Sequence, residues 1–274
     1  MTEELTDKQI KEELEGIDKF NQQVDAFKFY DGPDRDRSYV ELKKYYEGLP
    51  RSIGVSSKLP ELEGLIEGFK EGELIVISGR TGEGKTTFAQ SLIRDFSDDG
   101  NASLLMSYEV GTQDIIKRFA VPTLNLAMQT EVKAYDLVWL EQRIWEGIAK
   151  FKIKAVFIDH LHYLIDFATP SSNTSFVIGK TLRALKIMAL KTHVPIFLIS
   201  HLTKLSTGTE PTINDLRDSS FIGQEADTVL MIWRDDERTS NKSFVKVGKS
   251  RRTGNRETIQ VQLENGRFRE TYNG

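Results

Sequence analysis

The sequence of 274 residues contains no cysteine, which excludes disulfide bonds, thiol nucleophiles and cysteine-ligated zinc. It also lacks a long apolar run, because no stretch approaches the roughly 18 residues that a membrane-spanning helix needs. The first residues, MTEELTDKQIKEELEG, are acidic, whereas a signal peptide would be basic and then apolar. We therefore expect a globular, cytoplasmic protein with no membrane partner.

The sequence has little net charge. The formal charge is -4 at pH 7, which by itself does not indicate a nucleic-acid-binding protein. The carboxyl end differs, because residues 201–274 carry 12 basic and 11 acidic side chains, with several basic ones in KVGKSRRTGNR. This segment is either a local basic surface or an ordinary solvated hairpin. With 39% hydrophobic residues, the chain can bury a substantial core as one large domain or two small ones.

Two kinds of pattern divide the chain near residue 50. Residues 6–29 and 38–50 predict two short helices, each with a capping-box spacing at its start. From about residue 60, β-branched runs alternate with helical segments, which is typical of a mostly parallel sheet flanked by helices. The predicted strands are 73–78, 102–107, 153–159, 194–200 and 227–235, followed by antiparallel strands at 243–250, 257–264 and 266–272. The predicted helices are 85–97, 112–120, 134–150 and 176–192.

The segment SGRTGEGKTTFAQ, residues 78–90, has the spacing G-x-x-x-x-G-K-[ST] from Gly79 to Thr86. In such a loop, backbone N–H groups and the positive end of the following helix bind phosphate. Lys85 would reach the β- and γ-phosphates, and the Thr86 hydroxyl would bind Mg²⁺. We therefore expect a nucleoside triphosphate, ATP or a dNTP, with Mg²⁺. The predicted nucleotide-binding residues are Gly79, Arg80, Thr81, Gly82, Glu83, Gly84, Lys85, Thr86 and Thr87.

Three further polar residues end or follow predicted strands, where ligands bind in open parallel sheets. Asp159 closes KAVFID and is a candidate for holding Mg²⁺, the alternative being a turn cap. Glu109 follows SLLMSY and could polarise the attacking water, the alternative being a surface charge. His201 ends PIFLIS and either binds the γ-phosphate or is structural. Glu83 is an unusual acid beside an anion, and we expect it to point outward.

Several segments follow one another in an order that is more specific than any one of them. They are GRTGEGKT, SYE, VFIDHLHYL, ISHLTK, DLRDSSFIGQEADTVLMIWRD and GKSRRTGNRETIQVQLENGRF. Over roughly residues 50–272, this order resembles the motifs of DnaB-type hexameric replicative helicases, including phage primase-helicases and the mitochondrial helicase Twinkle. The resemblance implies a RecA-like α/β domain at 51–274, with a mostly parallel sheet and an antiparallel carboxyl-terminal edge. Residues 1–50 would be a helical extension that docks on a neighbouring subunit or packs within its own chain.

The resemblance also implies roles for individual residues. Lys85 and Thr86 match the phosphate-loop lysine and the Mg²⁺-binding hydroxyl, Glu109 the catalytic base, Asp159 the Mg²⁺-associated carboxylate, His201 the γ-phosphate sensor, and Lys249 and Arg251 the lysine and arginine finger that reach a neighbouring subunit's nucleotide. Because such a finger acts from outside its own subunit, a monomer should hydrolyse nucleotide poorly and a homo-hexameric ring well.

Single-stranded DNA would run through the centre of the ring. The inner loops correspond to about 166–176 and 202–223, whose small and polar residues suit close approach to a phosphate backbone. An ordinary solvent loop is the alternative for each. The predicted DNA-binding residues are Lys204, Arg217, Asp218, Ser219 and Ser220.

The resemblance thus implies an NTP-driven DNA helicase that moves 5′ to 3′ on single-stranded DNA and unwinds duplex DNA in replication. Primase, polymerase or a loader would be further partners, and a viral protein in a host cell would also fit. Two alternatives stay open. One is a RecA-like recombinase- or clock-type ATPase, and the other is a helicase loader that binds nucleotide without unwinding DNA.

Overall fold

The computed structural model describes residues 7–32, 35–47, 54–119, 121, 123–165, 174–201, 209–216, 219–235 and 242–271. The chain divides into two compact units, Met1–Arg51 and Ser52–Gly274. We call the first the helical unit and the second the α/β unit. Each is described by itself.

The helical unit contains α1 (Asp7–Phe27) and α2 (Tyr39–Glu47). On α1, Ile17, Phe20, Val24 and Phe27 recur at intervals of three and four residues, and all four side chains are exposed. The predicted capping box at the start of α2 is present. The Glu41 N–H donates to Ser38 Oγ at 3.2 Å, and the Ser38 N–H donates to Glu41 Oε2 at 2.8 Å.

One mixed sheet forms the centre of the α/β unit. Its strands are β1 (Leu74–Gly79), β2 (Ser103–Ser107), β3 (Leu126–Met128), β4 (Ala155–Asp159), β5 (Ile196–His201), β6 (Thr228–Arg234), β7 (Lys242–Ser250), β8 (Thr258–Glu264) and β9 (Arg267–Glu270). Among the residues that the structure describes, the strand order is β3-β2-β4-β5-β1-β6-β7-β8-β9. Strands β1 to β6 pair in parallel, and β6 to β9 pair antiparallel. The predicted antiparallel edge is therefore confirmed.

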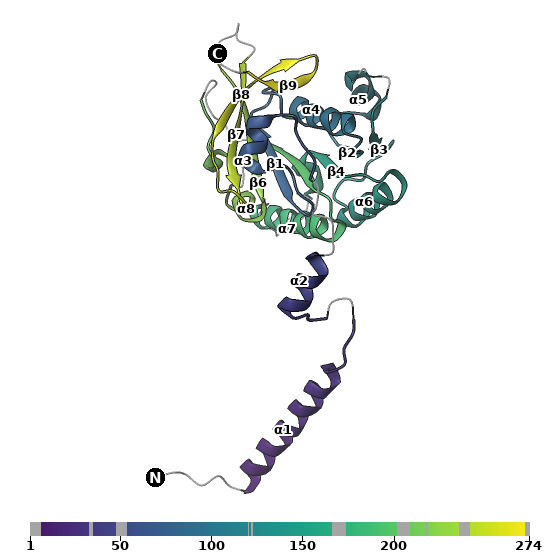
Figure 1. Cartoon of the computed structure of the whole chain (residues 1–274), viewed down its shortest axis with the longest axis vertical. Coiled ribbons are helices and arrows are strands. Elements are labelled where there is room, and N and C mark those ends of the chain that lie inside the picture. Colours follow the sequence, from purple (N-terminus) through teal and green to yellow (C-terminus); the bar gives the residue numbers. More distant parts are fainter. Residues whose placement is uncertain are drawn as a thin grey trace. The chain divides into compact units, whose positions relative to one another are not determined.

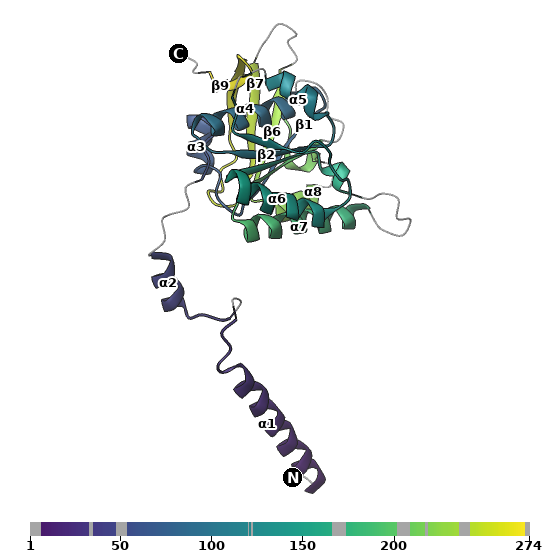
Figure 2. The same ribbon diagram turned by 90° about the vertical axis from the view of Figure 1, so that its right-hand side faces the viewer.

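Helices cover both faces of this sheet. They are α3 (Pro60–Ile66), α4 (Lys85–Asp98), α5 (Thr112–Phe119), α6 (Leu137–Phe151), α7 (Thr174–Thr192) and α8 (Ser219–Glu225), with short 3-10 turns η1 (Leu161–Leu164) and η2 (Ile213–Asp215). Figures 1 and 2 show α4 and α5 on one side of the sheet and α6 and α7 on the other.

The alternation of side chains along each strand builds two cores. On β1, Ile75 and Ile77 point to the core under α3, α4 and α5, whereas Leu74 and Val76 point to the core under α6, α7 and α8. All four side chains are fully buried, and each such residue stabilises the fold by about 1.5–3 kcal/mol. The sheet is consequently fixed between two apolar layers, and its strand ends carry the polar residues.

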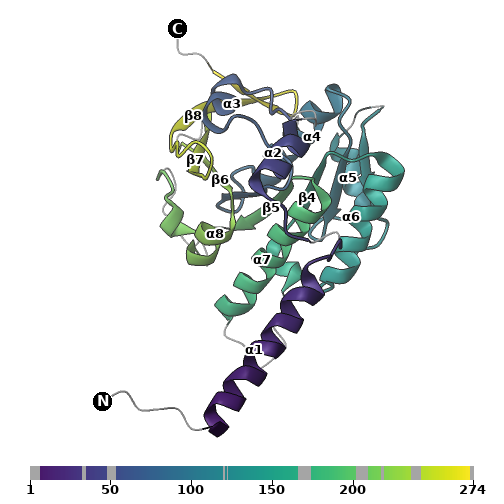
Figure 3. The ribbon, with the colours of Figure 1, turned by 60° about the horizontal axis from the view of Figure 1, so that its bottom comes forward.

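The two ends of the sheet lie on opposite flanks of the α/β unit. Strand β3 is at one end of the strand order, and the antiparallel strands β7, β8 and β9 are at the other. Figure 3 shows α6 on one flank and β7 and β8 on the opposite one.

The structure contains α3, β3 and α8 in addition to the predicted elements. No helix within the described ranges is long and apolar enough to cross a membrane.

Candidate functional site

The phosphate loop lies between β1 and α4. Gly84 precedes α4 with φ of 100°, a left-handed conformation, and no side chain caps the helix start. The N–H groups of the first helical turn and the positive helix end therefore face the loop. Gly79 is needed for a different reason, because a Cβ there would lie 2.5 Å from the Ile232 carbonyl oxygen of β6. The chain thus forms an anion-binding turn at the carboxyl edge of the sheet.

Lys85 is the first residue of α4 and is buried, with 5% of its surface exposed. Its Nζ donates to the Arg80 carbonyl oxygen at 2.9 Å. Burial lowers the pKa of Lys85, and the nearby Asp159, Glu109 and Glu83 carboxylates oppose that shift. A buried ammonium at the loop is a partner for phosphate oxygens.

Thr86 and Asp159 meet across the loop. The Thr86 hydroxyl donates to Asp159 Oδ2 at 3.0 Å, and Asp159 is the last residue of β4. Burial raises the pKa of Asp159 to about 6, and Glu109 adds to the shift, while Thr86 and Lys85 act against it. A hydroxyl and a carboxylate are the oxygen ligands that Mg²⁺ prefers, and a divalent cation would supply the charge that the buried carboxylate needs. These two residues therefore fit a magnesium ion.

Glu109, His160 and His201 gather at the open side of the site. One ligand atom of each lies within 4.8 Å of the others, the single such group found among the described residues. The His160 and His201 rings meet edge to face at 4.7 Å. Burial, then His201, His162 and Lys85, lower the pKa of His160 to about 4, so its ring is neutral at pH 7.

The hydrogen bonding of His160 defines which nitrogen carries its proton. Its Nδ1 accepts the His162 backbone N–H at 3.3 Å, so Nε2 carries the proton. A protonated Nε2 is a hydrogen-bond donor rather than a metal ligand, and we assign no second ion to this group. His160 is absent from the predicted site, although it directly follows Asp159 in the sequence.

A cavity of about 210 Å³ contains most of the predicted site. It is lined by Thr81, Gly82, Gly84, Lys85, Thr86, Thr87, Glu109, Asp159, His201 and Arg234. Gly79, Arg80 and Glu83 belong to the loop but do not line the cavity. Arg234 is a cation that sequence reasoning missed. It ends β6 at the same sheet edge where Asp159 and His201 end their strands, and that position was the available signal.

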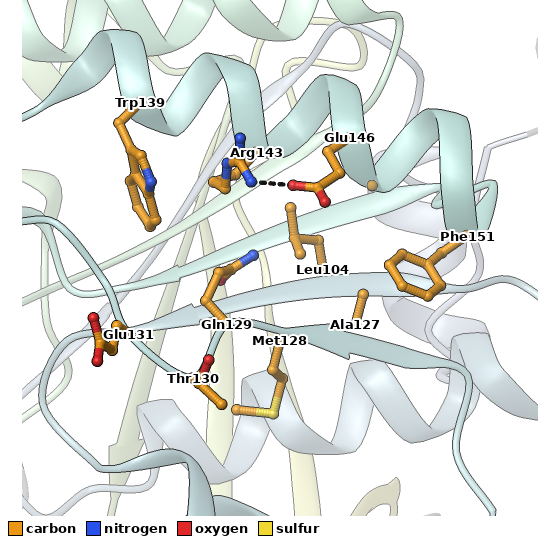
Figure 4. Close-up of a pocket in the computed structure, with 11 residues that line it drawn as sticks. Leu104, Ala127, Met128, Gln129, Thr130, Glu131, Trp139, Arg143, Glu146 and Phe151 are labelled. Carbon is orange, nitrogen blue, oxygen red and sulfur yellow. Dashed lines mark hydrogen bonds and ion pairs between the residues drawn. The ribbon is translucent and has the colours of Figure 1, made fainter.

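A second, larger cavity of about 370 Å³ lies between β3 and α6 (Figure 4). Leu104, Trp139 and Phe151 form apolar parts of its lining, and Arg143 is paired with Glu146 in the same groove. It contains neither a glycine-rich loop nor a lysine, in contrast to the cavity at β1. It therefore lacks the features of a triphosphate site.

Lys249 and Arg251 lie at the amino edge of the parallel strands, opposite the carboxyl edge that carries the phosphate loop. Because β7 runs antiparallel to β6, Lys249 pairs with Val229, near the start of β6, and the Arg251 N–H donates to the Asp227 carbonyl oxygen at 2.8 Å. From there to the phosphate loop is the length of β1, about 16 Å at ~3.3 Å per residue. Neither side chain can serve the nucleotide cavity of its own chain.

Both side chains have partners near the end of α8. Lys249 Nζ donates to the carbonyl oxygens of Gly223 at 2.7 Å and Ala226 at 2.6 Å. Arg251 Nη2 donates to the Gln224 carbonyl oxygen at 2.6 Å, and Nη1 donates to Asp227 Oδ1 at 3.0 Å. In a single chain, these two cations hold the end of α8.

The predicted DNA-binding residues are only partly described. Lys204, Arg217 and Asp218 lie outside the described residues, as do 166–173 and 202–208. Ser219 and Ser220 begin α8, and their side chains are not described. Within the described part of the second loop, Glu210 Oε1 accepts hydrogen bonds from Lys246 Nζ at 3.0 Å and Thr258 Oγ1 at 2.6 Å. This end of the loop is attached to β7 and β8.

Known proteins match the chain over most of the α/β unit. A family model of the DnaB-like helicase C terminal domain matches residues 54–146 and 128–270. The probable replicative DNA helicase of Trieres chinensis is 27% identical over 255 residues, covering 74% of this chain and 52% of that protein. The replicative DNA helicase DnaC of Bacillus subtilis is 23% identical over 250 residues, covering 77% and 54%. The chain thus spans about half the length of these curated relatives.

Solved structures agree in fold. One solved ATPase domain superposes with a TM-score of 0.73 at 24% identity, covering 87% of this chain and all of that one. A DnaB-like replicative helicase, whose structure was described together with its interactions with primase, gives a TM-score of 0.71 at 23% identity and covers 92% of this chain and 70% of its own. The predicted RecA-like α/β class is confirmed. The phosphate loop, the strand order and the family model agree, and the chain belongs to the family of DnaB-like helicase C-terminal domains.

Proposed function

We propose that this chain is an NTP-driven, ring-shaped translocase on single-stranded DNA, and a DNA helicase that unwinds duplex DNA in replication. The observation that carries this proposal is the separation of the two halves of the site. The phosphate cavity is at the carboxyl edge of the sheet, and the candidate finger Arg251 is at the amino edge. A complete hydrolytic site therefore needs two copies of the chain.

Within one copy, Lys85 and the helix start of α4 bind the β- and γ-phosphates. Arg234 lines the same cavity and adds a second positive charge. Thr86 and Asp159 would hold Mg²⁺, which neutralises phosphate charge when it is bound. A cradle of this kind orients the γ-phosphoryl group for attack by water.

Glu109 is the proposed base. As the water oxygen bonds to the γ-phosphorus, its proton passes to the Glu109 carboxylate, and the bond from phosphorus to the bridging oxygen of the diphosphate breaks. His201 contacts the γ-phosphate and connects its presence to the loop after β5. His160 stays neutral because of its lowered pKa. Its Nε2–H can therefore donate a hydrogen bond in the site without adding a charge.

Arg251 would stabilise the transition state in the neighbouring copy, with Lys249 beside it. To do so, both side chains must leave the end of α8. The opposite flanks that carry β3 and β7 suit a head-to-tail contact, which closes into a ring when the rotation allows it. The exposed apolar stripe of α1 would add a docking contact on the adjacent copy.

The DNA would pass the loops at 166–176 and 202–223. Lys204, Arg217, Asp218, Ser219 and Ser220 are the proposed contacts. Because Lys249 and Arg251 hold α8, which begins with Ser219 and Ser220, their release would loosen the helix next to the DNA loop. By its family, the chain would move 5′ to 3′ and work with primase, polymerase or a loader.

A forked duplex with a labelled strand tests the proposal. We expect strand separation that requires ATP or a dNTP, Mg²⁺ and a 5′ single-stranded arm, together with a particle mass of a ring when nucleotide and DNA are present. A strand-exchange assay run in parallel separates this function from that of a recombinase. Nucleotide binding without hydrolysis or unwinding would instead identify a loader.

A further inference from the structure

Glu83 is an acidic residue of the phosphate loop to which the proposed function gives no role. Its side chain does not line the phosphate cavity. It is not exposed on the far side of the loop either, because only 9% of its surface is accessible. A loop built to bind a polyanion therefore contains a buried carboxylate directly behind the binding surface.

The contacts of Glu83 are with the loop itself. Its Oε2 accepts the Arg80 backbone N–H at 3.3 Å, and its Oε1 lies 3.6 Å from Arg80 Nη1. Burial raises the pKa of Glu83, while Arg80, then Lys85 and Arg234, act to lower it. The last two line the phosphate cavity, so Glu83 interacts with the charges that would bind phosphate.

We propose that Glu83 sets the affinity of the site: it is a fixed negative charge behind the loop that weakens the hold of Lys85 and Arg234 on bound nucleotide and speeds release of the diphosphate. The inference rests on the proposed function, because it assumes that the cavity binds nucleotide. Glu83 and Lys85 are both largely buried, whereas Arg234 is exposed, so water screens the interaction only in part and we expect one unit charge at Glu83 to change affinity by about ten-fold.

Glu83→Gln isolates the charge. Glutamine keeps the acceptor oxygen for the Arg80 N–H and nearly the same volume, so the loop keeps its shape. We expect the variant to bind fluorescent N-methylanthraniloyl-ADP with Mg²⁺ about ten-fold more tightly, with a correspondingly slower dissociation rate in a stopped-flow chase. Glu71→Gln, an exposed acid outside the loop, is the matched control and should change neither quantity.

Arg80→Gln distinguishes charge from loop support. It removes a cation and leaves Glu83 uncompensated, so we expect weaker binding and faster release, the opposite of Glu83→Gln. Purely structural roles would make both variants weaken binding. Thermal unfolding of each variant verifies that it is folded.

Unchanged or weaker binding by folded Glu83→Gln, while the unaltered chain binds ADP, would overturn the inference and leave the proposed function intact. Absence of nucleotide binding by the unaltered chain would overturn both.

Discussion

Two buried aspartates, one at the amino edge and one at the carboxyl edge of the parallel strands, show how differently one residue type is used. Asp227, 6% exposed at the amino edge, accepts hydrogen bonds from Lys186 Nζ at 2.7 Å and Arg251 Nη1 at 3.0 Å. Asp159, 3% exposed at the carboxyl edge, accepts one from the Thr86 hydroxyl, and its pKa is raised to about 6. The first carboxylate is neutralised by its own chain, and the second is left for a ligand.

The difference is a general guide to function. A buried carboxylate with cationic partners stabilises the fold, and Asp95 repeats the pattern with Arg267 and Arg269. A buried carboxylate whose pKa is raised mainly by burial reduces stability and marks a candidate site. Mutation of Asp227 should therefore lower the free energy of unfolding, whereas mutation of polar residues at the carboxyl edge should lower activity.

The largest expected effect tests the carboxyl edge. Glu109→Gln should lower NTP turnover by about 10²–10⁴-fold, because the amide cannot accept the proton of the attacking water. Since Glu109 is exposed, the free energy of unfolding should change by less than about 0.5 kcal/mol. Phosphate release and thermal unfolding measure the two quantities. Full turnover in the variant would exclude Glu109 as the base and remove the contrast between the two edges.

The next effect tests the amino edge. Asp227→Asn should lower the free energy of unfolding by about 3 kcal/mol, because it leaves the Lys186 ammonium, whose side chain is only 17% exposed, without its counter-charge. The half-exposed Arg251 contributes less, since solvent screens it. Asp114→Asn is the control, because Asp114 is an exposed carboxylate near Lys117. This variant should change the free energy of unfolding by less than about 0.5 kcal/mol. Urea unfolding measures both, and equal losses would mean that the pairing of Asp227 is not structural.

A smaller effect, opposite in sign, is expected at Asp159. Its folded pKa of about 6 lies above the ordinary value of 3.8, so ionisation costs stability at pH above 6, and the cost disappears below pH 3.8. In chelator and without nucleotide, Asp159→Asn should stabilise the chain by about 1–3 kcal/mol at pH 7.5. The gain should vanish as pH falls toward 4. A variant less stable than the unaltered chain at pH 7.5 would contradict the assignment.

The smallest effect concerns Arg234. Arg234→Gln should weaken ADP binding by about three- to ten-fold through the loss of one partly solvated charge, with little change in unfolding temperature. Arg252→Gln is a matched control, because Arg252 pairs with Glu73 away from the cavity. Fluorescence titration with labelled ADP measures the difference. Equal affinity in both variants would show that Arg234 lines the cavity without binding nucleotide.

Site residues could be predicted from the sequence where they stand directly at the end of a recognisable strand or in the phosphate loop. Lys85, Asp159 and His201 were predicted as strand-end or loop residues, and the structure brings them into one cavity because parallel strands end at the same edge. Strand β3 was missed because its three residues are too few to establish an alternating pattern.

Other features depend on contacts between distant parts of the chain. The pairing of Asp227 joins residues 41 and 24 positions away, and no local spacing reports it. The burial of Glu83 likewise depends on packing around the loop. The sequence therefore predicted an outward side chain and did not predict that this side chain is buried. The roles of Lys249 and Arg251 remain predictions from family resemblance.

If two copies of the chain share one hydrolytic cleft, a mixture of two inactive variants should regain activity. Lys85→Ala and Arg251→Ala, each verified as folded, should hydrolyse almost no NTP alone. A one-to-one mixture with DNA should recover about a quarter of normal turnover, the fraction of head-to-tail contacts with both residues intact. No recovery in the mixture, together with full turnover by the unaltered chain as a dilute monomer, would mean that each copy contains a complete hydrolytic site.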